Sequence, residues 1–132
     1  MGACLSAISS TGLEPKIGFL HEERAGRYSL ALDLMEEFRP LLADRLVLAI
    51  INRKQVALED FKTNPTNGSV TLNDNARKRV IEAWNERKDI LVTNPGTGSK
   101  NKAGLLIYYQ AGLLAKRIVN KNEEYIPCVL RI

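Results

Sequence analysis

The chain has 132 residues, of which 45% are hydrophobic and 26% charged, and these values are typical of one folded domain rather than of a disordered segment. No apolar run reaches the roughly 20 residues that a membrane-spanning helix needs. The net charge of +4 and the isoelectric point near 9.2 are compatible with nucleic-acid binding, although many other enzymes are equally basic.

The first helix is expected over Gly2–Ser10, where apolar residues recur at helical spacing. Gly12 supplies a stop, and Pro15 prevents the helix from continuing. Lys16–His21 follows as a short apolar stretch that is extended or loop-like. Because the helical pattern is already under way at the start of the chain, we expect the helix to begin upstream and the chain to be a fragment.

The second helix is expected to begin at Ser29, whose side chain can accept backbone N–H groups as an N-cap. Leu30, Leu34 and Phe38 recur every four residues and predict one buried face. The more polar side of this helix carries three carboxylates: Asp33, Glu36 and Glu37.

Pro40 interrupts this pattern and either kinks the helix or starts a second one. A strongly apolar helix is then expected from Leu41 to Arg53. Its buried residues are expected to be Leu42, Leu46, Ala49 and Ile50.

Two short apolar stretches, Val56–Phe61 and Ser69–Leu72, flank the turn-forming segment KTNPTNG and predict a small β-hairpin. Asn73 is expected to cap the next helix, Asp74–Lys88. The apolar face of that helix is expected to hold Val80, Ile81 and Trp84.

The segment TNPGTGSKNK is expected to be a flexible loop, and Ala103–Val119 is the last clear helix before YIPC ends the regular structure. No internal repeat is evident. The predicted fold is therefore mainly α, a helical bundle domain with one small β-hairpin.

The glycine-rich stretch GTGSKNK lacks the P-loop spacing, since no four residues separate two glycines ahead of a Lys-Ser or Lys-Thr pair. Its Lys100 and Lys102 can still contact nucleic-acid phosphates. Neither cysteine lies in an activated context or at metal-ligand spacing, and no serine has the nucleophile-elbow motif. The two cysteines are best explained by a reducing, cytoplasmic setting.

The single histidine, His21, precedes the helix that carries the acids. Asp33 and Glu36 are three residues apart, so they project from one side of the helix, about 4.5 Å apart along its axis. A divalent cation would relieve the repulsion between these carboxylates, and an imidazole ligand favours Mn²⁺ over Mg²⁺. The spacing alone, however, favours a solvated helix face and a histidine that merely caps a loop.

The stretch GLEPKIGFLHEERAGRYSLALDLMEEFRPLLADRLVLAIINRKQ resembles the C-terminal helical domain of the CRISPR spacer-acquisition integrase, the first of the Cas proteins. The likeness continues through LND, EAW, the loop before GLL, and YYQAGLLAK, so that it covers almost the whole chain. The tail most resembles members that accompany type I-C systems. The resemblance implies that residues 1–132 form the C-terminal catalytic domain, without the family's N-terminal β domain.

The resemblance also implies a metal site for Mn²⁺ or Mg²⁺. His21 and Glu36 would be metal ligands, Asp33 would have a supporting catalytic role, and Glu37 would be a less suitable ligand. The family's third ligand is a glutamate upstream of ACLSAI, and Glu14 matches a turn instead. We therefore expect weak metal binding and little or no catalysis by this chain alone.

The implied activity is that of a metal-dependent DNA endonuclease and integrase, which inserts prespacer DNA into a CRISPR repeat by transesterification. The implied partners are DNA, the second of the Cas proteins and, in the full-length protein, a second copy, with no membrane involved. Five basic residues are candidates for DNA contact: Arg24, Arg27, Arg39, Lys100 and Lys102. The alternative is a non-catalytic helical module for DNA binding or assembly, in which the acids bind no metal.

Overall fold

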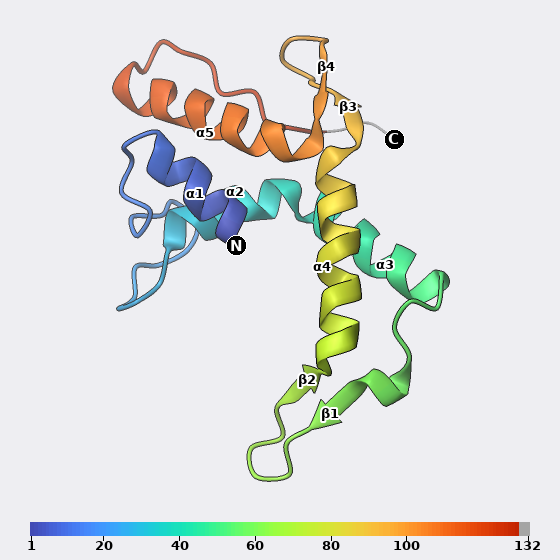
Figure 1. Cartoon of the computed structure of the whole chain (residues 1–132). Helices are drawn as coiled ribbons and strands as arrows, with labels where there is room; N and C mark the ends of the chain where they lie inside the picture. Colours follow the sequence, from blue (N-terminus) through green and yellow to red (C-terminus); the bar gives the residue numbers. More distant parts are fainter. Residues whose placement is uncertain (130–132) are drawn as a thin grey trace.

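Helices α1, α2 and α5 pack against one another and organise the computed structural model, which describes residues 1–129 (Figure 1). In chain order the elements are α1 (Gly2–Ser10), α2 (Ser29–Phe38), the π-helical turn η1 (Arg39–Asp44), α3 (Arg45–Asn52), the 3₁₀ turn η2 (Leu58–Asp60), β1 (Phe61–Thr63), β2 (Val70–Leu72), α4 (Asp74–Asp89), β3 (Leu91–Thr93), β4 (Lys100–Lys102) and α5 (Ala103–Val119). The prediction of a mainly α domain is confirmed.

The hydrophobic core lies where α1, α2 and α5 meet. Ile8 from α1, Leu34 from α2 and Ile107 from α5 are each at most 3% exposed. The predicted apolar face of α2 is confirmed, because Leu30 and Phe38 are buried with Leu34. Burial of each such side chain contributes about 1.5–3 kcal/mol, so this face fixes the rotation of α2 about its axis.

Pro40 lies near the start of the π-helical turn η1, which joins α2 to α3. Proline has no N–H to donate to the carbonyl four residues earlier, and the wider turn accommodates that loss. The helical pattern is thus interrupted, as predicted. Leu42 and Ile50 are buried, whereas Leu46 and Ala49 are only half-buried.

The hairpin predicted around KTNPTNG is confirmed, although its first strand lies later than expected. Strand β1 spans Phe61–Thr63 rather than Val56–Phe61, because the preceding residues form the turn η2. The expectation of a flexible loop at TNPGTGSKNK is wrong, since this segment forms a second antiparallel hairpin, β3–β4.

The two hairpins repeat each other at an offset of 30 residues, so the expectation of no internal repeat is also wrong. Thr63 pairs with Val70 in the first hairpin, and Thr93 pairs with Lys100 in the second. The turns match as well: each has a glycine in the left-handed region, with φ of 68° at Gly68 and 70° at Gly98. Turn chemistry, rather than apolar alternation, therefore forms both hairpins.

Helix α4 begins as predicted, with Asn73 Oδ1 accepting a hydrogen bond from the Ala76 N–H at 2.8 Å. It carries one hairpin at each end and extends, with α3, away from the three packed helices (Figure 1). Ile81, predicted to be buried, is 51% exposed because this part of α4 lies beyond the core. Within residues 1–129, no helix combines the length and apolar composition that crossing a membrane requires.

Ser29 does not act as the predicted N-cap. It is the first residue of α2, and its Oγ donates to the Glu22 carbonyl at 2.9 Å instead of accepting from the helix. This bond ties the loop after His21 to the start of α2.

Candidate functional site

Residues 18–21 lie directly against the first turns of α2, and the lack of a side chain at Gly18 permits this approach. A Cβ at Gly18 would lie 2.7 Å from Ser29 Cβ and 2.9 Å from Asp33 Oδ2. Any other residue would push the loop away from the helix. The GFLH motif therefore begins with glycine because the loop packs against α2.

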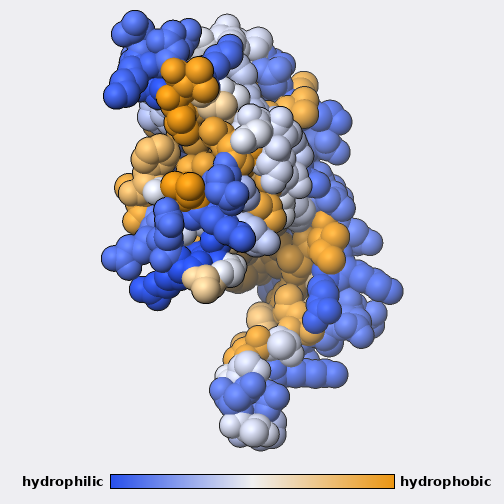
Figure 2. All heavy atoms as spheres, turned by 90° about the vertical axis from the view of Figure 1, so that its left-hand side faces the viewer, coloured by the Kyte–Doolittle hydropathy of each residue, from blue (hydrophilic) through white to orange (hydrophobic). Residues whose placement is uncertain are grey.

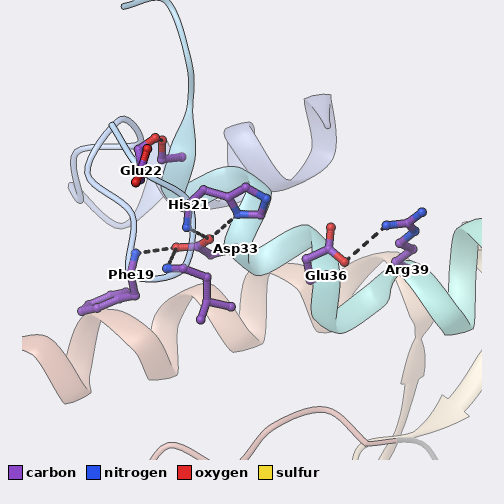
Figure 3. A network of polar contacts seen from close by, with 8 residues as sticks. Phe19, His21, Glu22, Asp33, Glu36 and Arg39 are labelled. Atoms are coloured by element: carbon purple, nitrogen blue, oxygen red, sulfur yellow. Dashed lines mark hydrogen bonds and ion pairs between the residues drawn. The ribbon is translucent and has the colours of Figure 1, made fainter. Parts of the chain in front are cut away.

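The Asp33 carboxylate holds this loop in place. Its Oδ2 accepts from the backbone N–H groups of Phe19 at 2.5 Å and Leu20 at 3.1 Å, and its Oδ1 accepts from that of His21 at 3.0 Å (Figure 3). Partial burial by itself would raise the pKa of Asp33, but the hydrogen bonds from the His21 side chain and the three backbone groups together lower that pKa. Asp33 is therefore an anion at neutral pH.

The imidazole of His21 completes the set of donors to Asp33, with Nδ1 2.6 Å from Oδ1. Because an ionised carboxylate only accepts, this contact assigns the ring proton to Nδ1 and leaves Nε2 with a free lone pair in the neutral ring. The His21 side chain is 25% exposed, against 9% for Asp33. The His21 ring is thus partly accessible to solvent, while its Nδ1 is held by Asp33.

Glu36 lies about one turn after Asp33, on the same side of α2 as the His21 ring (Figure 3). Its side chain is 40% exposed, and its Oε2 is 3.5 Å from Arg39 Nη1. Two groups 15 positions apart in sequence, His21 and Glu36, are thereby brought to one surface of the helix.

The donor set fits a divalent cation in part. A neutral imidazole anchored through its other nitrogen by a carboxylate is the usual arrangement of a metal-ligating histidine, and Glu36 adds an oxygen donor. The oxygens of Asp33 already accept four hydrogen bonds, so Asp33 orients His21. Within the described residues, no three His, Cys, Asp or Glu side chains form a group that could hold a metal ion.

Glu37 faces a different set of partners, which the sequence did not reveal. Its carboxylate accepts hydrogen bonds from Gln110, Tyr125 and Cys128, which follow it by 73 to 91 positions. Such long-range contacts leave no local pattern in the sequence. A pocket of about 370 Å³ lies beside Glu37 and is lined by the following ten residues: Phe19, Leu20, Leu30, Asp33, Leu34, Glu36, Glu37, Leu114, Tyr125 and Pro127.

Three of the five basic candidates lie close to the His21 loop or to Glu36. Arg24 and Arg27 belong to the loop that follows His21, and Arg39 lies between the Glu36 and Asp44 carboxylates. The other two, Lys100 and Lys102, lie on β4, which leads into the N-terminal end of α5, away from the His21 loop (Figure 1). Lys102 Nζ, one of this second pair, is 2.9 Å from Asp89 Oδ1. The fold therefore does not gather the five residues into one cluster.

Known proteins resemble this chain over most of its length. The family model described as CRISPR associated protein Cas1 matches residues 1–86. A protein named CRISPR-associated endonuclease Cas1 1, from Moorella thermoacetica, is 48% identical over 128 residues, which cover 97% of this chain and 37% of that protein. The chain thus spans between a third and a half of the length of such relatives.

Solved structures share the fold. A casposase bound to integration product matches with a TM-score of 0.83 and 28% sequence identity, over 92% of this chain and 35% of that one. A Cas6-RT-Cas1–Cas2 complex matches with a TM-score of 0.80 over 99% of this chain and 14% of that one, but its 22% identity shows the fold alone. The family model matches well over half of the sequence, and it includes the GFLH loop and all of α2. The chain belongs to the Cas1 family of CRISPR-associated proteins.

Proposed function

We propose that this chain is the C-terminal catalytic domain of a Cas1 integrase, which joins the 3′-hydroxyl of prespacer DNA to a CRISPR repeat by transesterification. The observation that supports this proposal most strongly is the anchored imidazole of His21, with its Nδ1 2.6 Å from Asp33 and the Glu36 carboxylate on the same side of α2. The casposase relative, whose structure contains an integration product, supports integration rather than hydrolysis alone.

In this proposal His21 Nε2 and a Glu36 oxygen would hold a divalent cation, Mn²⁺ or Mg²⁺. When bound, such a cation lowers the pKa of an attacking hydroxyl and stabilises charge on a scissile phosphate. The chain's own contribution is positional. Asp33 keeps the proton on Nδ1, directs Nε2 outward and supplies negative charge behind the ring, which makes the imidazole a stronger donor.

Arg24, Arg27 and Arg39 are proposed to contact the DNA backbone at this site, because a guanidinium can donate two hydrogen bonds to one phosphate. Arg39 Nη1 lies 3.5 Å from Glu36 Oε2, so its guanidinium is next to the proposed ligand. Lys100 and Lys102 would contact DNA elsewhere, from the second hairpin.

Two protein ligands alone would bind a divalent cation weakly. We therefore propose that the third ligand is an acid from another segment of the family's architecture, outside residues 1–132. Cas2 and a second Cas1 copy are the proposed protein partners, DNA is the proposed substrate, and the cytoplasm is the proposed location. The assignment to a type I-C system belongs to this proposal as well.

Histidine resonances offer a direct test, because the chain has a single histidine and its imidazole C–H signals need no assignment. Titration with Mn²⁺ should broaden these signals before others, and Glu36→Gln should weaken the effect. Glu82→Gln, the same change on an exposed face of α4, is the matched control. Equal broadening in both variants would remove Glu36 from the ligand set.

Catalysis is tested in the full-length protein with its partner and Mn²⁺. His21→Ala and Glu36→Gln should each reduce strand transfer by at least a hundredfold, while Glu82→Gln should not. Undiminished activity in both site variants would contradict the proposal.

The second candidate function is a non-catalytic module for DNA binding or assembly. It is favoured by one observation, that no complete group of three ligands exists within residues 1–129. DNA binding that persists in His21→Ala, in a full-length protein that performs no strand transfer, would support it.

A further inference from the structure

The Glu37 carboxylate is the meeting point of three segments of the chain. Gln110 Nε2 from α5 donates to Oε1 at 2.6 Å, the Tyr125 hydroxyl donates to Oε2, and the Cys128 backbone N–H donates to Oε1. Gln110 is 2% exposed and Cys128 is 6% exposed, so these bonds lie largely out of water. We call these four residues the Glu37 clasp.

The clasp holds a stretch of chain that has no helix or strand of its own. Residues 120–129 follow α5 without regular structure, and Gln110, which donates to Glu37, also donates to the Ile126 carbonyl within this stretch at 3.0 Å. Tyr125 and Pro127 from this stretch line the 370 Å³ pocket, and so does Glu36 of α2. The C-terminal stretch therefore depends on Glu37 for its position next to the candidate site.

Adjacent helix residues point about 100° apart, so the direction of Glu37 sets that of Glu36. With Glu37 held against α5 and the C-terminal stretch, Glu36 is turned to the side on which His21 lies (Figure 3). We propose that Glu37 is a positioning residue, which through the clasp holds both the C-terminal stretch and the direction of the Glu36 carboxylate. The part that concerns Glu36 rests on the proposed function, whereas the part that concerns the C-terminal stretch does not.

The donors of the clasp stay protonated at neutral pH, so its hydrogen bonds do not depend on pH in that range. Burial, followed by the hydrogen bond and the charge of Glu37, raises the pKa of Tyr125, so the phenol keeps the proton it donates. Burial and then the charge of Glu37 raise the pKa of Cys128 to about 11. The Cys128 thiol is thus protonated, buried and slow to react at neutral pH.

Apolar side chains also form part of the protein surface. Apolar residues gather over the packed helices there, with hydrophilic residues around them (Figure 2). A stretch without helix or strand hydrogen bonds needs specific polar contacts to hold one position. The Glu37 carboxylate, which can accept from several donors at once, supplies such contacts.

Thiol labelling tests the clasp without any assay of activity. Cys4, buried in α1, and Cys128, in the clasp, are the two cysteines, and peptide-resolved mass spectrometry can follow both in one reaction. We expect Glu37→Ala to accelerate labelling of Cys128 roughly tenfold or more, because several bonds to a charged acceptor are lost, while labelling of Cys4 stays unchanged.

Two milder variants keep the test valid if Glu37→Ala fails to fold. Glu37→Gln retains an acceptor for Gln110 and can donate to the Tyr125 oxygen, so labelling of Cys128 should stay close to that of the unaltered protein. Tyr125→Phe removes one donor and should give an intermediate rate. If Glu37→Ala accelerated the labelling of Cys4 and Cys128 equally, or accelerated neither, the proposed role of the clasp would be contradicted.

Strand transfer by the full-length protein then tests positioning. Glu37→Ala should raise the Mn²⁺ concentration for half-maximal activity roughly tenfold, leave KM for DNA unchanged and be rescued by Glu37→Gln. Glu36→Gln should abolish transfer while Cys128 stays protected. A Glu37→Ala protein with released Cys128 and an unchanged Mn²⁺ response would overturn the positioning role alone. Activity that survives Glu36→Gln would instead contradict the proposed function and leave the labelling result intact.

Discussion

Replacing Asp33 by asparagine tests whether the anion organises the His21 loop. Four N–H groups donate to its two oxygens at 2.5 to 3.1 Å. Asparagine keeps one acceptor oxygen and puts an NH₂ group at the other position, so two of the four donors lose their partner. A hydrogen bond to a charged group contributes about 1.5–3 kcal/mol, but loop N–H groups can turn to water. We therefore expect Asp33→Asn to lower the free energy of unfolding by about 2–3 kcal/mol.

Urea denaturation followed by far-ultraviolet circular dichroism measures this loss. Asp44→Asn is the matched control, because Asp44 is 58% exposed and its carboxylate is 3.7 Å from Arg39, so its loss should be below about 0.5 kcal/mol. The imidazole signals of His21 should also shift in Asp33→Asn, since the ring loses its anchor. A loss no larger than that of the control, with unchanged histidine signals, would refute the reasoning.

Three further results are expected. Gly18→Ala should destabilise the protein by about 1–3 kcal/mol in urea denaturation, because its Cβ would lie 2.7 Å from that of Ser29; a neutral effect would contradict the close packing. Hydrogen bonds, the largest effect coming from the Ala57 backbone N–H, lower the pKa of Asp60. Ionised Asp60 therefore stabilises the fold at pH values above the usual carboxyl pKa near 3.9, and this stabilisation is lost as the pH falls through the lowered pKa. Asp60→Asn should accordingly lower the thermal midpoint at pH 7 but much less at pH 3, and an equal decrease at both would contradict this. Ile107→Ala, at a site 1% exposed, should cost about 2–5 kcal/mol in urea, whereas Leu105→Ala, at a site 56% exposed, should cost below about 0.5 kcal/mol; similar losses would contradict the assigned core.

Helices were predictable from sequence because their signals are local. The spacing of Leu30, Leu34 and Phe38 reports burial directly, and Asn73 marks the start of α4 by cap chemistry. The second hairpin was missed because β4, Lys100–Lys102, lacks the apolar alternation of a typical strand. A comparison of the two TNP segments, 30 residues apart, would have revealed it.

The candidate site was predictable only in part. The spacing of Asp33 and Glu36 placed both on one side of a helix, but the contact of His21 with Asp33 depends on a loop conformation that Gly18 permits. Glu37 resembled an ordinary solvated acid, since its donors come from α5 and the C-terminal stretch. Tertiary contacts of this kind do not follow from helical periodicity.

The repeated turn gives the molecule an internal standard for measuring what tertiary packing adds to a hairpin. The Gly68 N–H donates to the Asn64 carbonyl at 2.9 Å, and the Gly98 N–H donates to the Asn94 carbonyl at 2.8 Å. Asn64 is exposed, whereas Asn94 is 3% exposed, in a turn that approaches Tyr109 of α5. Slower amide hydrogen exchange at Gly98 than at Gly68 would report the protection that a neighbouring helix confers on an otherwise equivalent turn, within one chain and one sample.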